Sequence, residues 1–256
     1  MAVANPSEET IVDPNEENTV FTISQWKKYF NVDLKYNDQS EPWNRETIIY
    51  FSIKYQSLQD NSNDSEESVL RKCLEYELKI GNEINLIPNE SVLCGILKNS
   101  ATSHAEEILF DRLRKGFNSF QKEKKKTTTN SKSDDLSEEM RKLHVTDGYQ
   151  AMALNNLSIK LIQNYSPCSK CAEVIIAFID EFSSMWNIDI SIIFGSFYKF
   201  YLEKNREGLK KLHNKGIQLN TAWERFRQTF EEIGTPERRA ARERDDLNNM
   251  AIVKKN

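Results

Sequence analysis

The sequence contains no apolar run long enough to span a membrane, and only four of its 256 residues are cysteine. Its first 20 residues lack lysine and arginine, and they lack the basic start and apolar core of a signal peptide. Two of the four cysteines stand in a C-x-x-C spacing, which favours metal binding over a disulfide framework. We therefore expect a protein of the cytoplasm and/or the nucleus that has no membrane partner.

The sequence also lacks an excess of basic charge, since its formal net charge is -4 at pH 7. Negative charge is concentrated in residues 1–20, which carry five acidic side chains: Glu8, Glu9, Asp13, Glu16 and Glu17. Without this segment the other 236 residues have a net charge near +1. The composition predicts a disordered acidic tail over residues 1–20. The nearly neutral remainder permits binding of a polyanion without requiring it.

What is present is an alternation of strand-like and helix-like segments, with no internal repeat. Runs rich in β-branched and aromatic residues predict strands at residues 47–53, 92–97, 159–165, 190–194 and 217–219. Apolar spacing and capping residues predict helices at 104–120, 167–182 (with Pro167 in the first turn), 205–215 and 221–234, and others starting at Ser24 and Thr235. Residues 60–67 and 122–131 are expected to be loops, and residues 69–80 fit either a helix or a strand. This order predicts an α/β fold.

Three side chains form a candidate metal site: His104, Cys168 and Cys171. One imidazole and two thiolates suit zinc, and three protein ligands leave a fourth position open, as in catalytic zinc sites. His104 and Cys168 fall at predicted helix starts, where the helix dipole favours a thiolate. A structural zinc site with Cys73 or Cys94 as a fourth ligand is the alternative. His144 and His213 are expected to be surface or helix-face histidines.

Glu106 lies two residues after His104 and could carry protons for a hydrolytic reaction. The alternative is that Ser103 to Glu106 form a capping box, in which Glu106 only reaches back to the start of its helix. Each short motif is weak alone. Together, however, H-x-E and P-C-x-x-C form the signature of zinc deaminases that act on nucleobases.

At these residues the chain resembles the AID/APOBEC family of polynucleotide cytidine deaminases. The resemblance extends to Arg45-Glu46-Thr47 and the strand after it, to Gly95 through Asn99 before His104, and to the segment Asn205 to Leu219. It implies a three-layer zinc-dependent cytidine deaminase fold with a five-stranded mixed sheet flanked by helices. The implied deaminase domain covers residues 21–235, with insertions at 57–90 and 116–156, and a charged C-terminal helix covers 236–256.

The resemblance also implies substrate-binding roles for Asn99, Tyr165, Ser166 and Tyr198. Asn99 would contact the target nucleotide, Tyr165 would form a wall against the cytosine ring, and the Ser166 backbone would lie near the amino group of the base. Tyr198 would pack beside the target base, and such stacking contributes about 1–3 kcal/mol per base. Alternatively, the two tyrosines are strand-end aromatics of the core. Lysines that could line a groove are Lys98, Lys122, Lys124, Lys125, Lys126, Lys199 and Lys204.

The function that the resemblance implies is conversion of cytosine to uracil in single-stranded DNA or RNA, with DNA slightly favoured. Zn2+ would be the cofactor, a zinc-bound hydroxide would attack C4, and Glu106 would shuttle the protons. The biological purpose could be immunity, mutation or editing. One alternative is a catalytically silent, zinc-stabilised member of the fold that binds nucleic acid or protein. Another is a tRNA-type adenosine deaminase, although the enzymes of that type have a glutamate at the position where this chain has Ser166.

Overall fold

The computed structural model describes residues 10–12, 20–22, 47–56, 64–81, 83–87, 92–130, 155–225 and 236–255. The helix expected from Ser24, the end of the helix expected at Gly234, and His144 lie outside these residues. Two short strands, β1 (Thr10–Val12) and β2 (Val20–Thr22), pair antiparallel with each other. Among the described helices none is long and apolar enough to cross a membrane.

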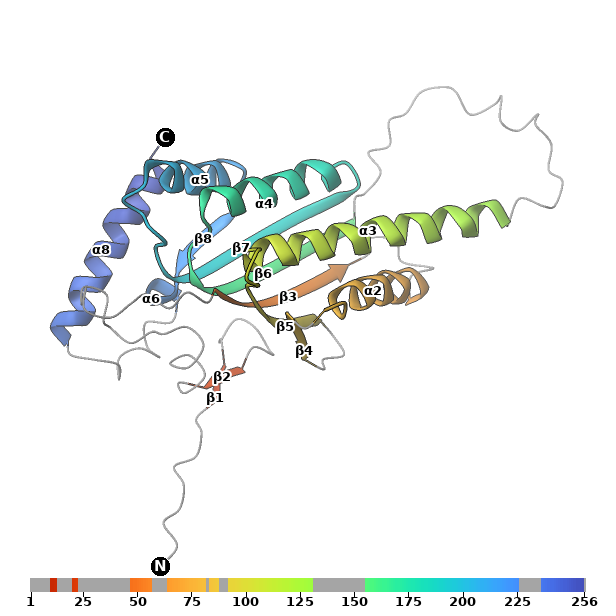
Figure 1. Ribbon diagram of the computed structural model, residues 1–256, viewed down its shortest axis with the longest axis horizontal. Helices are drawn as coiled ribbons and strands as arrows, with labels where there is room; N and C mark the ends of the chain where they lie inside the picture. Colours follow the sequence, from red (N-terminus) through yellow and green to blue (C-terminus); the bar gives the residue numbers. More distant parts are fainter. Residues whose placement is uncertain are drawn as a thin grey trace, which may run out of the picture.

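The main sheet has six strands in the order β4-β5-β3-β6-β7-β8 (Figure 1). Their bounds are β3 Ile48–Gln56, β4 Ile84–Ile87, β5 Leu93–Lys98, β6 Asn155–Tyr165, β7 Trp186–Ser196 and β8 Gln218–Thr221. The expected α/β class and mixed sheet are confirmed, but the number of five strands is wrong. The additional strand is β4, a four-residue edge strand with alternating half-buried and exposed residues. So short an alternation is too weak a signal to identify from sequence.

Helices follow the strands and pack side by side across the sheet (Figure 1). Their bounds are α2 Asp64–Leu78, α3 Ala105–Asn130, α4 Ser169–Phe182, α5 Glu203–Asn214, α6 Ala222–Arg225 and α8 Pro236–Lys254. Helix α2 packs against α3, α3 against α4, α4 against α5, and α5 against α8. Residues 69–80, for which the sequence allowed a helix or a strand, fall mostly in helix α2.

Two expected loops are wrong because they overlap helices. Helix α2 already begins at Asp64, and α3 continues through the lysine-rich segment to Asn130. Lysine and glutamate are good helix formers, so a low apolar content does not by itself end a helix. An exposed ion pair three residues apart, Lys126 to Glu123 at 2.8 Å, fits the helical spacing.

The buried core lies between the sheet and its helices, and its aromatic part joins α3 and α4 to the sheet. Phe117 of α3 is in contact with Phe178 and Phe182 of α4, with ring centroids 5.9 and 5.3 Å apart. The ring of Trp186, at the start of β7, lies 5.3 Å from Phe117 and 5.1 Å from Tyr55 of β3. These contacts fix α3 and α4 on the sheet, and with them the residues at their first turns.

The carboxyl ends of β5, β6 and β7 lie at the same edge of the sheet. Strands β5 and β6 both pair antiparallel with β3, and β7 is parallel to β6, so all three run in one direction. Their last residues are followed by the starts of α3, α4 and α5. Ligand sites in sheets with parallel strands commonly form at this edge.

Helix α8 is attached to the end of β7 by Arg242. This buried guanidinium donates hydrogen bonds to the carbonyl of Gly195 and to Ser196 Oγ, the latter at 3.3 Å. Its Nε donates to Asp246 Oδ2 at 3.0 Å, one turn further along the helix. The C-terminal helix thereby holds the strand end that precedes Tyr198.

Candidate metal centre and active site

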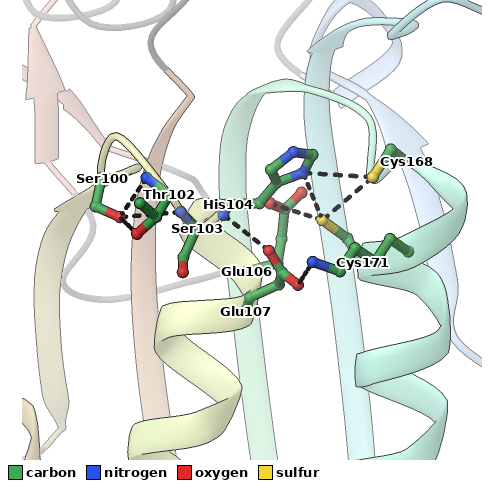
Figure 2. A network of polar contacts seen from close by, with 9 residues as sticks. Ser100, Thr102, Ser103, His104, Glu106, Glu107, Cys168 and Cys171 are labelled. Atoms are coloured by element: carbon green, nitrogen blue, oxygen red, sulfur yellow. Dashed lines mark hydrogen bonds and ion pairs between the residues drawn. The ribbon is translucent and has the colours of Figure 1, made fainter.

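His104 is the residue immediately before helix α3. Glu107, in the first turn of that helix, caps it. The backbone N–H of His104 donates to Glu107 Oε2 at 2.9 Å, while Lys170 of α4 pairs with Glu107 Oε1 at 2.7 Å. Burial opposes the charged form of Glu107, but these two partners hold its pKa below its usual value. The capping-box interpretation of Glu106 is therefore wrong, because the side chain that accepts from the backbone at the helix start is that of Glu107 (Figure 2).

Cys168 and Cys171 are supplied by the turn between β6 and helix α4. Cys168 is the N-cap residue with extended backbone angles, and its carbonyl accepts from the N–H of Ala172 at 2.9 Å. Cys171 lies three residues later in the first turn, so both sulfurs share one side of the helix start, 3.5 Å apart. Pro167 precedes the N-cap, so its expected place in the first turn is wrong by two residues.

The two helix starts bring the three candidate ligand atoms together (Figure 2). His104 Nδ1 lies 3.2 Å from Cys171 Sγ and 3.4 Å from Cys168 Sγ. A tetrahedral zinc ion with ordinary bond lengths needs its N and S ligands about 3.5–3.8 Å apart. The triangle is thus only slightly smaller than zinc requires, and the donor set suits zinc.

The two sulfurs have opposite protonation preferences. The contact with the Cys171 sulfur, 3.5 Å away, lowers the pKa of Cys168 to about 5 despite its burial. The same contact, together with burial, raises the pKa of Cys171. The lowered pKa favours the thiolate of Cys168, which is the form of cysteine that binds zinc.

The other two cysteines do not join this group in the described part of the chain. Cys94 lies on β5 and its thiol contacts the carbonyl of Ile87 at 3.6 Å, while Cys73 lies on α2. Burial raises the pKa of both thiols. The geometry therefore favours three ligands with an open position over a four-ligand structural site.

The carboxyl group of Glu106 faces the candidate ligands from the first turn of α3. Its side chain is 2% exposed, and burial raises its pKa. Oε2 accepts from the Cys171 thiol at 3.3 Å, and Oε1 accepts from Gln163 Nε2 at 3.3 Å. Gln163 is a residue that sequence reasoning missed; the available signal was a polar pair, Gln163-Asn164, directly after the apolar Leu161-Ile162 near the end of β6.

Tyr165, Ser166 and Tyr198 lie together beside the carboxyl ends of β6 and β7. The two tyrosine rings have centroids 6.1 Å apart in an edge-on arrangement. Ser166 Oγ accepts from the N–H of Tyr198 at 2.9 Å, and the N–H of Ser166 donates to the carbonyl of Ser196 at 2.7 Å. Tyr165 is mostly buried and Tyr198 partly so. Their roles toward a substrate remain predictions.

Asn99 follows β5, and its side chain makes hydrogen bonds with two backbone groups. Its Oδ1 accepts from the N–H of Thr47 at 2.7 Å, and its Nδ2 donates to the carbonyl of Ser100 at 3.3 Å. The side chain thus joins the loop before His104 to the start of β3. Its expected contact with a nucleotide stays a prediction.

Asn205 is a second residue that sequence reasoning missed. It is 3% exposed, and its Oδ1 accepts from the N–H of Ser169 at 3.1 Å. Its Nδ2 donates to the carbonyls of Tyr198 and Lys199 at 3.2 and 3.3 Å. One amide therefore joins the cysteine-bearing turn to the loop after β7. Nothing in the sequence distinguishes Asn205 from an ordinary residue in the first turn of a helix.

Comparisons with known proteins identify the family of this chain. The sequence matches the family described as APOBEC3, cytosine deaminase domain, over residues 110–255, a range that includes both cysteines and begins after Glu106. It is also 37% identical over 57 residues to the "DNA dC->dU-editing enzyme APOBEC-3Ca" of Felis catus. That match covers 22% of this chain and 28% of the relative, so it takes in less than a third of the relative's length. Because the family match takes in more than half of the chain, this protein belongs to the AID/APOBEC family.

Proposed function

We propose that this protein is a zinc-dependent deaminase that converts cytosine to uracil in single-stranded polynucleotide, with DNA slightly favoured over RNA. The observation that carries the proposal is the position of Glu106, whose Oε2 lies 3.3 Å from Cys171 Sγ within the group formed by His104 and the two cysteines. A buried carboxyl beside an open three-ligand metal site is the arrangement that hydrolytic deamination needs.

In the proposed reaction, water adds to C4 of cytosine, the bond from C4 to the amino nitrogen breaks, and ammonia leaves. His104, Cys168 and Cys171 would hold a zinc ion, which would lower the pKa of water and so make a nucleophile available near neutral pH. Glu106 Oε2 takes the two protons of the attacking water in turn, and it passes one to ring nitrogen N3 and the other to the leaving amine. These transfers require a carboxyl that stays close to the metal ligands, as Glu106 does.

The proposed substrate is a single strand because the reacting base must leave the stack to reach a buried carboxyl. The rings of Tyr165 and Tyr198 pack edge-on beside the cysteine-bearing turn, and Ser166 Oγ accepts a hydrogen bond from the N–H of Tyr198. The preference for DNA is supported by the feline relative alone, which is named as a DNA dC->dU-editing enzyme. The domain boundaries at residues 21 and 235, and a location in the cytoplasm and/or the nucleus, belong to the same proposal.

The test is the appearance of uracil. Purified protein with about one zinc ion per chain is incubated with matched single-stranded DNA and RNA that each contain one cytosine. Uracil is expected from both wild-type protein and Glu107→Gln, which retains an acceptor for the helix cap, and it is expected to be absent with Glu106→Gln. A fully zinc-loaded wild-type protein that yields no uracil from either strand would refute the activity and leave a binding protein.

A further inference from the structure

We infer that Gln163 is a positioning residue for Glu106: its side-chain amide holds one carboxyl oxygen so that the other faces the metal ligands. This inference rests on the proposed function. Gln163 lies on β6 with its side chain fully buried, and Nε2 donates to Glu106 Oε1 at 3.3 Å. Among the described contacts of the Glu106 carboxyl, the hydrogen bond from Gln163 is the one that comes from a strand side chain.

The orientation of the Gln163 amide is fixed by a second partner. Nε2 donates to the backbone carbonyl of Tyr165 at 2.6 Å. A carbonyl oxygen can only accept, so the nitrogen and not the oxygen of the amide must face it. The second hydrogen of the same NH2 group is then directed at Glu106. The Gln163 amide therefore donates, and the Glu106 carboxyl accepts, in the hydrogen bond between them.

The two oxygens of Glu106 consequently have different partners. Oε1 is held by Gln163, and Oε2 faces the Cys171 sulfur. If the carboxyl group turned away, a buried N–H of Gln163 would lose its partner, which is unfavourable where water cannot replace it. The amide thus favours the one rotation in which Oε2 can exchange protons with a reacting base.

The same amide links Glu106 to the predicted substrate wall. Its other bond goes to the backbone of Tyr165, whose ring lies 6.1 Å from the ring of Tyr198. The carboxyl and the aromatic wall are therefore held by the two hydrogens of one NH2 group. Such outer contacts, made to the groups that act on the substrate, preserve geometry during catalysis.

Fold stability alone does not account for Gln163. Within the described residues its Oε1 is buried with no hydrogen-bond partner. An apolar residue of similar length would fill the same place on β6 without that unpaired oxygen. Buried polar groups that are only partly satisfied are uncommon and are concentrated at functional sites.

The experiment replaces Gln163 by methionine, which has nearly the same length but no amide. We expect Gln163→Met to lower kcat for deamination by about 10- to 100-fold, with KM changed less than threefold and with zinc content at the wild-type level. Gln218→Met is the matched control, because Gln218 is an exposed residue of β8 that contacts Asp189. We expect it to change neither constant. A zinc-loaded Gln163→Met protein with kcat within twofold of wild type would overturn the inference.

A second measurement does not depend on any Gln163 variant being folded. The side-chain amide signals of Gln163 in an NMR spectrum are expected to shift when Glu106 is changed to glutamine, while those of Gln218 stay in place. Unshifted Gln163 signals would refute the contact. Wild-type protein without deaminase activity would refute the proposed function instead, and the NMR result would still decide whether Gln163 holds Glu106.

Discussion

Glu107 Oε2 accepts a hydrogen bond from the backbone N–H of His104 at 2.9 Å, whereas the adjacent Glu106 is directed toward Cys171. Two consecutive glutamates in one helical turn therefore have different surroundings. One is a partly exposed capping residue, and the other is a buried carboxyl next to the candidate metal ligands. Capping residues stabilise a helix, while buried carboxyls at functional sites commonly reduce stability.

We expect substitutions at these two positions to change stability in different ways. Glu107→Ala removes the cap and the ion pair to Lys170, so the free energy of unfolding should fall by about 0.5–2 kcal/mol. Glu106→Gln removes a buried ionisable group and should leave the free energy of unfolding unchanged or raise it. Urea denaturation of the two variants and the wild type measures both effects. A larger loss for Glu106→Gln than for Glu107→Ala would contradict the assignment.

Zinc binding should depend on two of the four cysteines. Cys168→Ser and Cys171→Ser each remove a ligand and should reduce bound zinc well below one ion per chain. Cys73→Ser and Cys94→Ser are the matched controls and should keep about one. Metal analysis of the four purified variants checks this. Loss of zinc in either control would support a structural site with a fourth cysteine ligand.

The sequence predicted this site better than it predicted the edges of the fold. His104, Cys168 and Cys171 are rare residue types in a recognisable spacing, and the segments before them hold enough apolar residues to predict strands, so we could expect the three side chains to meet. Strand β4 could not be predicted, because four residues are too few for a clear pattern. The continuation of helix α3 could not be predicted either, because residues 121–130 are all polar. Gln163 and Asn205 were missed for another reason. Their importance depends on which backbone groups the folded chain places within reach of an ordinary amide.

Asn205 should contribute more to stability than its position in a first helical turn suggests. Asn205→Ala leaves the N–H of Ser169 and the carbonyls of Tyr198 and Lys199 without their amide partner. We expect the free energy of unfolding to fall by about 1–3 kcal/mol. The control is Asn214→Ala at the exposed end of the same helix, which should change it by less than about 0.5 kcal/mol. Equal effects of the two substitutions in urea denaturation would show that the buried amide is unimportant.

Asp246 should give the protein a specific pH dependence. Burial raises its pKa to about 6, although Arg242 opposes this, and Asp245 and Glu224 add to the increase. An acid whose folded-state pKa lies above its unfolded value stabilises the protein while it is protonated. This contribution should be lost as the pH rises from about 4 to about 6, by up to about 3 kcal/mol.

Asp246→Asn removes that titration. The free energy of unfolding of the variant, measured relative to wild type, should therefore rise between pH 4 and pH 7. Denaturation at several pH values tests this. A constant difference across the range, or one that shifts in favour of the wild type, would mean that the ion pair with Arg242 outweighs burial.

The two helix starts that supply His104 and Cys168 are 64 residues apart in the chain. An ion bound by both would act as a reversible cross-link, comparable with a disulfide that closes a long loop. Such a link restricts the unfolded chain and adds the free energy of metal binding to that of folding. The melting temperature would then report on zinc supply, so a chelator would weaken the whole fold and not only silence one reaction.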